Sequence, residues 1–577
     1  MNLPSPIPIL LFSGLLMLPS AWAGETEWTG SVDNDWTNPD NWSNGVPDAD
    51  TDVLIPHQTP VALIDGDEAT ARDIVGPGTF QIQEGGRLEA RNLTTTVDLD
   101  SPIFSQVMVR DAGSELIIEE DFSLARAISR PSEALQSMQI RDGARLEVGG
   151  DMIIAENIGN GAASTHMTTE LRDEGSEMHV GNLILDRGSD FTWLYLNQSA
   201  RLIVENDFIL GPNGPSGGDP GDSLEIVIGS SMQGGASGLP PPILDLRASD
   251  PAIHGPGTGA GVVLNTDEED YSLVTEDGTP IDLTGTVDLV KWRDTNAIIE
   301  SDQVTDGHIT LEEGSLILPG EWPDASVHQD ANTMLRASAA IGQLDAAGNL
   351  RVGTESEPGP LQITENLIRR ASSLHELRIH PDGQHDALHA GGTIEFDGGV
   401  TEVQIADGDY PDEAEFVIMS TGESFIGEPN LVFENDSDRL VEYQVLVEEI
   451  RVTLIAQPQM DISTTQLDFG EIEIGDQADA TLILSNAGQA PLIVQPLPEP
   501  ALPFARTGGD CPAGFAFVLS EDQTCQVVYT FMPLTPENHE QALIIQHNAA
   551  DEETQFTLSG TGTGEPVSEI FEDRFEP

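Results

Sequence analysis

The stretch Leu116-Ile117-Ile118-Glu119-Glu120-Asp121-Phe122 carries the pattern that decides the fold. Its first three residues alternate apolar, variable, apolar, which is the period of two of a β-strand. Two turn-like residues follow, and then an Asp, whose side chain can bond nearby backbone and hold a corner. A further apolar residue comes next. The stretch therefore predicts a short strand, a corner and the start of another strand.

The same pattern recurs along the chain at a nearly constant spacing. It returns at 146–152, 202–208 and 361–367, with shortened copies at 88–93 and 178–183. From 88 through 116, 146 and 178 to 202, the first apolar residues lie 28, 30, 32 and 24 residues apart. Self-similarity at such a period, with no helical pattern between the copies, predicts a right-handed parallel β-helix. The residues expected to face inward and stack in register are Leu116, Ile118, Phe122, Leu146, Val148, Met152, Leu202, Val204 and Phe208.

The charge of the chain limits its partners. Among 577 residues there are 99 acidic and 23 basic ones, for a net charge of −76, and Lys291 is the only lysine. Little here could neutralise phosphates, so we expect neither nucleic acid nor an anionic membrane as a partner. The acidity fits a strongly hydrated surface, as in proteins adapted to high salt. Calcium binding by clustered carboxylates is the alternative, although no ordered Asp/Gly calcium repeat occurs.

Residues 1–23 look like a secretory signal peptide. They hold a short apolar core from Ile7 to Leu18 and end in Ala21-Trp22-Ala23, which predicts cleavage between Ala23 and Gly24. No Lys or Arg precedes the core, which is a departure from such signals. The core is too short to span a bilayer, and no other stretch could span one as a helix. We expect an exported protein that lies outside the cell or on its surface, with the periplasm as an alternative.

Residues 24–56 contain three tryptophans, Trp28, Trp36 and Trp42, followed by Gly45-Val46-Pro47 and a first strand. This order resembles the start of many large secreted bacterial β-helix and autotransporter-like proteins. We expect an N-terminal cap that covers the first rung and blunts an exposed sheet edge. A platform on which sugars stack is the alternative.

We expect residues 57–456 to form the β-helix. Residues 211–242, rich in Gly, Pro, Ser and Asp, indicate an excursion from a rung, and 331–344 have the spacing of a short helix or a loop. Residues 360–456 are similar to the C-terminal end of autotransporter passenger domains, with a Gly-x-x-Asp-x-Leu element at 383–388, Gly391-Gly392 and a closing group of strands. The residues after 456 depart from that family, so we do not expect a self-translocating autotransporter.

Residues 457–563 show short strands separated by turn signals, which is typical of a β-sandwich. Their ordered landmarks are Leu467-Asp468-Phe469-Gly470, 480–486, 525–533 and 556–562. Together these closely resemble the hydin-like, ASH-type immunoglobulin-like domain, which in bacteria occurs in proteins called choice-of-anchor D. Since an exported chain meets an oxidising compartment, we expect its two cysteines, Cys511 and Cys525, to form a disulfide.

Residues 564–577 form a C-terminal tail. Its last part, 569–577, resembles a short aromatic and acidic ending of some secreted gammaproteobacterial proteins, with Arg574 in place of the usual Gly. A sorting or secretion signal and a frayed terminus are both open interpretations.

Two clusters invite a chemical interpretation. His375, His380, His385 and His389 lie close together, as metal ligands would, but strand alternation favours solvent-facing strand and turn histidines. The segment 214–218 has the letters of a Gly-x-Ser-x-Gly nucleophile motif, but it lies in the expected excursion and not on a strand-turn-helix. With 99 acidic residues, no single carboxylate pair stands out. We predict no catalytic, cofactor-binding or metal-binding residue.

These observations predict an all-β, secreted or surface-exposed structural or adhesive protein without an evident catalytic site. Its partners would be a carbohydrate, a cell-envelope component or like subunits. One alternative is a polysaccharide lyase or glycoside hydrolase on the same scaffold, which clustered Asp and Arg in a groove would favour. The other is a calcium-dependent carbohydrate-binding protein, which ordered oxygen ligands at a turn would favour.

Overall fold

The computed structural model describes residues 24–565 except 58, 98–105, 128–134, 157–162, 187–188, 198, 212–222, 230–239, 267–269, 301–304, 306 and 438. The predicted signal peptide, most of the predicted excursion and the tail from 566 on lie outside the described residues. The chain divides into two compact units between Asn349 and Leu350. The part of the chain that is described is all-β, and its only helical element is one 3₁₀ turn, η1 (Pro39–Asn41).

The first unit contains the strands β1 (Glu25–Glu27), β2 (Asp52–Leu54), β3 (Ala62–Asp65), β4 (Glu68–Gly76), β5 (Phe80–Gln83), β6 (Arg87–Val97), β7 (Gln106–Arg110), β8 (Glu115–Ile118), β9 (Phe122–Ala127), β10 (Leu135–Arg141), β11 (Arg145–Ile154), β12 (Ala163–Leu171), β13 (Glu177–Leu185), β14 (Ser189–Asn197), β15 (Arg201–Val204), β16 (Phe208–Leu210), β17 (Ser223–Gly229), β18 (Ile243–Leu246), β19 (Ala252–Asn265), β20 (Tyr271–Ser272), β21 (Asp282–Lys291), β22 (Asn296–Ile298), β23 (His308–Leu311), β24 (Ser315–Leu318), β25 (Glu321–Gln329), β26 (Met334–Ala337) and β27 (Ala340–Ala346). Strand β28 (Asn349–Val352) lies at the division.

The second unit contains, before residue 457, the strands β29 (Pro360–Ile363), β30 (Leu367–Arg369), β31 (Leu374–Ile379), β32 (Ala387–Ala390), β33 (Ile394–Phe396), β34 (Val400–Ile405), β35 (Glu413–Thr421), β36 (Phe425–Ile426), β37 (Leu431–Asn435), β38 (Arg439–Val445) and β39 (Glu449–Ala456). After it come β40 (Met460–Ile462), β41 (Gln466–Glu473), β42 (Ala478–Asn486), β43 (Leu492–Val494), β44 (Phe504–Gly509), β45 (Phe517–Leu519), β46 (Thr524–Phe531), β47 (Asn538–Gln546) and β48 (Glu553–Thr563).

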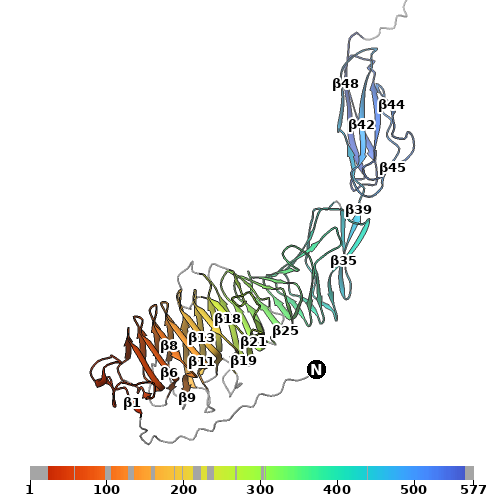
Figure 1. Cartoon of the computed structure of the whole chain (residues 1–577). Helices are drawn as coiled ribbons and strands as arrows, with labels where there is room; N and C mark the ends of the chain where they lie inside the picture. The colour runs from red at the N-terminus through yellow and green to blue at the C-terminus, as the bar shows by residue number, and fades with distance from the viewer. Residues whose placement is uncertain are drawn as a thin grey trace, which may run out of the picture. The chain divides into compact units, whose positions relative to one another are not determined.

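The strands of the first unit stack in three parallel columns. One column runs through β8, β11, β13, β15 and β18. A second uses β9, the later halves of β11 and β13, then β16 and β19. The third runs through β7, β10, β12, β14 and β17. Each turn of chain therefore adds one rung, and Figure 1 shows the labelled strands following one another along this unit.

The repeated apolar residues stack in register, as the sequence predicts. Leu116 lies opposite Leu146, Leu146 opposite Met178, and Met178 opposite Leu202. Two parallel series are Ile118, Val148, Val180 and Val204, and Phe122, Met152, Leu183 and Phe208. All the residues predicted to face inward are buried. Because successive side chains of a strand point to opposite faces, this register places every copy's apolar set in the interior.

The Asp or Asn at the corner of each copy bonds to the neighbouring rung. Asn92 Oδ1 accepts the backbone N–H of Asp121 at 3.1 Å, and Asp121 Oδ1 accepts that of Asp151 at 2.9 Å. Asn182 links two further rungs, because its Nδ2 donates to Asp151 Oδ1 at 2.7 Å and its Oδ1 accepts from the Asp207 N–H at 3.1 Å. The sequence predicted a bond to nearby backbone, and the backbone that these side chains reach belongs to the next turn.

The three tryptophans near the N-terminal end of the described chain are buried against one another. The ring of Trp42 lies 5.0 Å from that of Trp28 and 4.7 Å from that of Trp36, between centroids, and both contacts are edge-to-face. Trp28 Nε1 donates to the Pro60 carbonyl and Trp42 Nε1 to the Trp36 carbonyl, each at 2.7 Å. Since all three rings are buried, the geometry favours the cap over the sugar-stacking platform.

The helix or loop expected at 331–344 is wrong, because β26 and β27 occupy this segment and continue the columns. β26 pairs in parallel with β24, and β27 with β25. Leu335 and Ala337 are buried before a bend at 338–339, and Ile341 and Leu344 are buried after it. The bend breaks the alternation between two short strands, so the buried residues acquire a spacing that imitates a helix.

In the second unit, β29 pairs in parallel with β32, and β31 with β34, which pairs with β37. The last strands before residue 457 reverse this arrangement, since β39 is antiparallel to both β35 and β38. These strands are the closing group that the sequence predicts.

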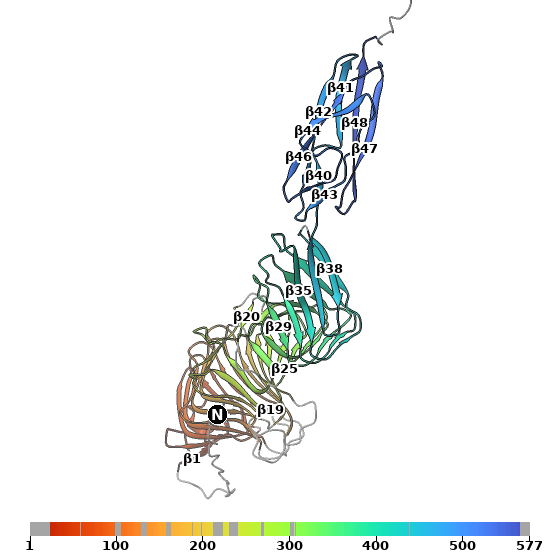
Figure 2. The ribbon, with the colours of Figure 1, turned by 90° about the vertical axis from the view of Figure 1, so that its right-hand side faces the viewer.

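Residues 457–563 form a β-sandwich with its own core. One sheet has the order β40-β42-β46-β44, another β41-β48-β47, and β43 pairs with β45. Figure 2 shows the long strands of this module lying side by side. Buried residues such as Leu484, Tyr529 and Phe556 fill the space between the sheets. Cys511 and Cys525 are bonded, with an S–S distance of 2.01 Å, inside this core. The immunoglobulin-like sandwich and the disulfide are therefore confirmed.

Candidate functional site

A ladder of alternating charges lies on the outer face of the first column. Arg87, Glu115, Arg145, Glu177 and Arg201 occupy one register position on five successive rungs. Arg87 Nε lies 3.3 Å from Glu115 Oε2, and Arg145 Nε lies 3.3 Å from Glu177 Oε1. Arg201 Nη1 lies 3.9 Å from the other oxygen of Glu177. Each position directly precedes a buried residue of the strand, so the charged side chain points outward.

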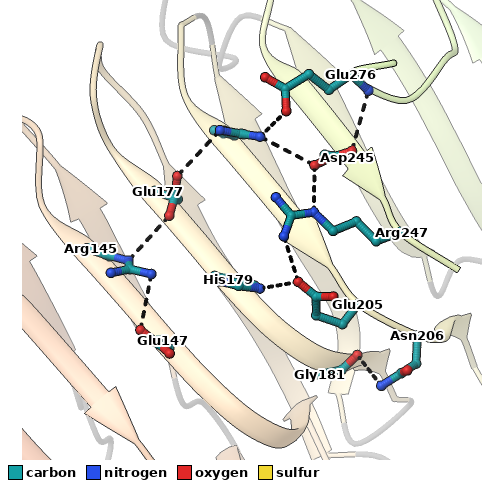
Figure 3. A network of polar contacts seen from close by, with 11 residues as sticks. Arg145, Glu147, Glu177, His179, Gly181, Glu205, Asn206, Asp245, Arg247 and Glu276 are labelled. Carbon is teal, nitrogen blue, oxygen red and sulfur yellow. Dashed lines mark hydrogen bonds and ion pairs between the residues drawn. The ribbon is translucent and has the colours of Figure 1, made fainter. Parts of the chain in front are cut away.

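The ladder ends in a denser network, which Figure 3 shows from close by. Asp245 Oδ2 lies 3.0 Å from Arg247 Nε and 3.4 Å from Arg201 Nη2. Arg247 also reaches Glu205, whose Oε1 lies 2.8 Å from Arg247 Nη1 and 2.6 Å from His179 Nε2. These residues come from three successive rungs, those of β13, β15 and β18, so the network connects turns of chain that are far apart in the sequence.

A groove of about 640 Å³ opens beside the network. Its walls are residues 245–249, Pro251, Thr275, Glu276, Asp277 and Thr279. The Asp245 side chain is only 8% exposed, and its Oδ1 accepts the backbone N–H of Glu276 at 3.4 Å. The Glu276 carboxylate pairs with Arg201. The groove therefore places Arg and Asp together on one outer face of the first unit.

Hydrogen bonds hold two groups of this network, Glu205 and Arg247, in their charged forms. The hydrogen bond from His179, followed by that from Arg247, holds the pKa of Glu205 below its usual value. The hydrogen bond to Asp245 raises the pKa of Arg247. A general acid or base works best with a pKa near the operating pH, whereas these shifts keep Glu205 and Arg247 charged. The arrangement stabilises contacts between rungs, by about 0–1 kcal/mol for an exposed pair.

Sequence reasoning missed Arg201, Asp245, Arg247 and Glu276. Arg201 and Glu276 are 75 residues apart, and no local motif unites them. A signal for the ladder was nevertheless present. The residue before the first apolar position of successive copies reads Arg, Glu, Arg, Glu, Arg from 87 to 201. Alternation at one register position predicts attraction between rungs, but it does not predict a groove.

The structure corrects the interpretation of the four histidines. His375 is buried, so the prediction that it faces solvent is wrong; it shares the parity of Leu377 and Ile379, which also point inward. Burial, helped by the charge of Arg369, lowers the pKa of His375 well below its usual value. His380, His385 and His389 are half-buried. His389 Nδ1 lies 2.8 Å from Ser420 Oγ, and the His385 ring packs against Phe416 at 5.2 Å.

The other predicted positions are placed as follows. Gly24 is the first described residue, whereas Ala23 and the segment 214–218 lie outside the described residues. Within the described ranges, no group of three or more His, Cys, Asp or Glu side chains is arranged to hold a metal ion. No helix among those residues is long and apolar enough to cross a membrane. The calcium alternative stays a prediction.

Comparison with known proteins concerns the C-terminal module. Residues 458–561 match the family described as HYDIN/CFA65/VesB-like, Ig-like domain. No curated protein matches the chain. The match covers less than a fifth of the sequence, so it characterises this module.

Several solved structures are similar over about a fifth of the chain. The ASH/PapD-like domain 7 of human CEP192 is 17% identical, with 19% of this chain and 88% of that one covered and a TM-score of 0.14. A protein of unknown function from Porphyromonas gingivalis W83 is 14% identical, with coverages of 22% and 64% and a TM-score of 0.16. The Vibrio cholerae VesB protease is 11% identical, with coverages of 20% and 38% and a TM-score of 0.16. Residues 458–561 therefore resemble, by the family match, the HYDIN/CFA65/VesB-like Ig-like domain, in agreement with the sandwich formed by strands β40 to β48.

Proposed function

We propose that this chain is an exported structural and adhesive protein that acts outside the cell or on its surface. In this proposal residues 57–456 form a right-handed parallel β-helix behind the cap at 24–56, and the immunoglobulin-like module belongs to a choice-of-anchor D type of architecture. Parallel crossover connections are right-handed in nearly all known cases, which supports the hand. Cleavage after Ala23 would release the mature chain.

The observation that carries the proposal is the continuity of the contacts between rungs. Apolar columns, corner bonds such as Asp121 to Asp151, and the ladder from Arg87 to Arg201 join the same turns at three places. Such redundancy stiffens a long surface without forming a reactive centre. A solenoid of this kind offers an extended face for binding.

The negative charge of the chain limits the kinds of partner that such a face can bind. With −76 on the chain, a polyanionic polymer would be repelled at long range. A neutral or amino-bearing carbohydrate, or an envelope component with similar chemistry, fits better. Self-association would have to bring two acidic surfaces together and would depend strongly on salt.

A polysaccharide lyase or glycoside hydrolase remains the second candidate, because one observation favours it. Asp245, Arg201 and Arg247 lie together at a groove of about 640 Å³, and β-helix enzymes that act on polysaccharides use Asp and Arg clusters on a rung face. Because Asp245, Arg201 and Arg247 pair with one another, a structural role between rungs is favoured over a catalytic one.

One experiment separates these functions. The mature protein is incubated with insoluble and soluble neutral, amino-bearing and acidic polysaccharides, with and without a chelator. Co-sedimentation measures binding, and new reducing ends or unsaturated products measure cleavage. We expect binding to non-anionic polymers without cleavage and without an effect of the chelator. Cleavage that is lost in Glu276→Gln would establish the enzyme, binding lost with chelator would establish the calcium alternative, and no binding to any polymer would refute adhesion to carbohydrate.

A further inference from the structure

A second, smaller cavity of about 270 Å³ lies where three neighbouring strands end. β19 ends at Asn265, β21 at Lys291 and β23 at Leu311. Leu264 lies opposite Lys291 and Lys291 opposite Leu311, so the residues that follow them occupy equivalent places on successive turns. The cavity, called here the Trp292 pocket, is lined by Asn265, Trp292, Arg293, Glu312 and Glu313.

The only lysine of the chain fixes the backbone of this pocket. Lys291 is buried, and its Nζ donates to the carbonyl oxygens of Trp292 at 2.5 Å and Arg293 at 2.7 Å. The Lys291 carbonyl accepts the backbone N–H groups of Glu312 at 3.1 Å and Glu313 at 3.4 Å. The chain segments that carry the pocket's aromatic ring, guanidinium and two carboxylates are therefore held by one residue.

The indole of Trp292 is half-buried and packs against apolar side chains. It packs against a small, separate cluster of buried residues, Tyr195, Val227 and Val263, which lie opposite one another on successive strands. Arg293 Nε donates to Asn265 Oδ1 at 2.9 Å. Aromatic rings fixed in this way at a cavity wall offer a flat apolar surface beside polar groups.

Two exposed carboxylates face the same cavity. Glu312 and Glu313 are exposed and line it together. Partial desolvation raises the pKa of Glu312, and the nearby indole N–H of Trp292 acts in the opposite direction. The pocket thus combines two hydrogen-bond acceptors, one guanidinium and one aromatic face.

We propose that the Trp292 pocket binds one non-anionic pyranose unit of a carbohydrate, an inference that rests on the proposed adhesive function. The apolar face of the sugar ring stacks on Trp292, and its hydroxyl groups donate to Glu312 and Glu313. Two carboxylates against one guanidinium disfavour uronic acids and favour a neutral sugar or an amino sugar, whose ammonium is also attracted by the indole. The volume lies just below the range of ~300–1,000 Å³ typical of drug-sized ligands, which suits a single ring.

The larger groove beside Asp245 fits this chemistry less well. None of the residues that line it is aromatic. Its charged groups already have partners, since Asp245 pairs with Arg247 and Glu276 with Arg201, and Asp277 accepts hydrogen bonds from neighbouring threonines. The groove thus offers no ring on which a sugar could stack. It provides a natural control, because Glu276→Gln alters that groove and leaves the Trp292 pocket intact.

The test uses isothermal titration calorimetry of the full chain with hexamers of N-acetylglucosamine, glucosamine and galacturonic acid. We expect binding of at least one of the first two and none of the third. Trp292→Ala should weaken binding by about tenfold or more, the scale of one lost aromatic contact, whereas Trp292→Phe should retain part of it. Glu312→Gln/Glu313→Gln should weaken the glucosamine hexamer most, and Glu276→Gln should bind as the unaltered protein does.

The outcomes separate this inference from the proposed function. If polysaccharides still co-sediment with the protein but neither Trp292→Phe nor Glu312→Gln/Glu313→Gln changes the affinity, the site lies elsewhere and adhesion stands. Preferential binding of the galacturonate hexamer would also refute the assignment. Circular dichroism melts of each variant establish whether it is folded. If Trp292→Ala proves unstable, the affinity of Glu312→Gln/Glu313→Gln decides the result. If no polysaccharide co-sediments and no hexamer binds, both proposals fail.

Discussion

The carboxylate of Asp121 accepts a hydrogen bond at 2.9 Å from the backbone N–H of Asp151, the residue at the same position of the next rung. The Asp121 side chain thus links the corners of two neighbouring rungs, as backbone hydrogen bonds link their strands. Backbone bonds such as that from the Gly150 N–H to the Glu120 carbonyl also join these corners, and the Asp121 side chain adds a further link. This relationship makes Asp121 a structural residue although it is exposed.

Replacing Asp121 with Ala should lower the free energy of unfolding by about 1 kcal/mol, the usual net value of one hydrogen bond. Asp121→Asn keeps an acceptor oxygen and should lose less. Urea denaturation followed by circular dichroism measures both. Glu119→Ala, an exposed carboxylate on the same corner, is the control. Equal effects of Glu119→Ala and Asp121→Ala would show that the corner bond contributes nothing.

Leu146→Asp should disrupt the rungs on either side of it. Leu146 is fully buried between Leu116 and Met178, and burial of a carboxylate without a partner costs several kcal/mol. Leu146→Met nearly conserves the volume and should cost less than about 1.5 kcal/mol. Thermal melts of the two variants provide the comparison, and an unchanged melt of Leu146→Asp would contradict the stacked core.

His375 should make stability depend on pH. The folded state keeps it neutral because its pKa is lowered by burial and by Arg369, whereas the unfolded chain takes up a proton below about pH 6.5. The unfolded state then binds more protons, so the free energy of unfolding falls as the pH drops below that value, by up to about 1.4 kcal/mol per pH unit. Urea denaturation at several pH values should show a flatter profile for His375→Leu. The control is His380→Leu, and identical slopes for all three proteins would remove His375 as the cause.

Salt should stabilise the chain. The net charge of the chain is −76, and repulsion between its like charges opposes the compact state. The screening length falls from ~30 Å at 0.01 M to ~3 Å at 1 M salt. Screening also weakens the ladder, but its exposed pairs contribute only about 0–1 kcal/mol each, so repulsion dominates. The melting temperature should rise with NaCl, and more than with a neutral osmolyte at equal osmolality. A flat or falling dependence would end the high-salt interpretation.

A fragment of residues 457–563 should fold alone. Its sheets enclose their own core, and the Cys511–Cys525 disulfide, which joins residues 14 apart in sequence, lies wholly within it. Closing such a loop stabilises by roughly 3 kcal/mol in the chain-entropy model. Reduction should therefore lower the melting temperature of the fragment while leaving the transition of the parallel-stranded residues before 457 in the full chain. An unfolded fragment under oxidising conditions, or two free thiols by mass spectrometry, would contradict this boundary.

The amino-acid sequence determined the features that depend on local alternation and spacing. The period-two pattern at 116–122 and its copies specifies which side chains point inward, and the repeat length specifies that copies lie opposite one another. The same alternation places His375 inward with Leu377 and Ile379. The histidine prediction is wrong for this residue because it assigned all four histidines to the solvent without applying the alternation to position 375. The order of strand and turn signals after residue 457 specified the immunoglobulin-like sandwich.

Only the tertiary structure decided which outward-facing side chains meet. Arg201 reaches Asp245 across 44 residues and Glu276 across 75, and the Trp292 pocket joins the ends of three strands. Alternation fixes the face of a side chain but says nothing of its neighbour one turn away. That neighbour depends on register, which the packing of the whole interior sets by burying each rung's apolar residues against the next.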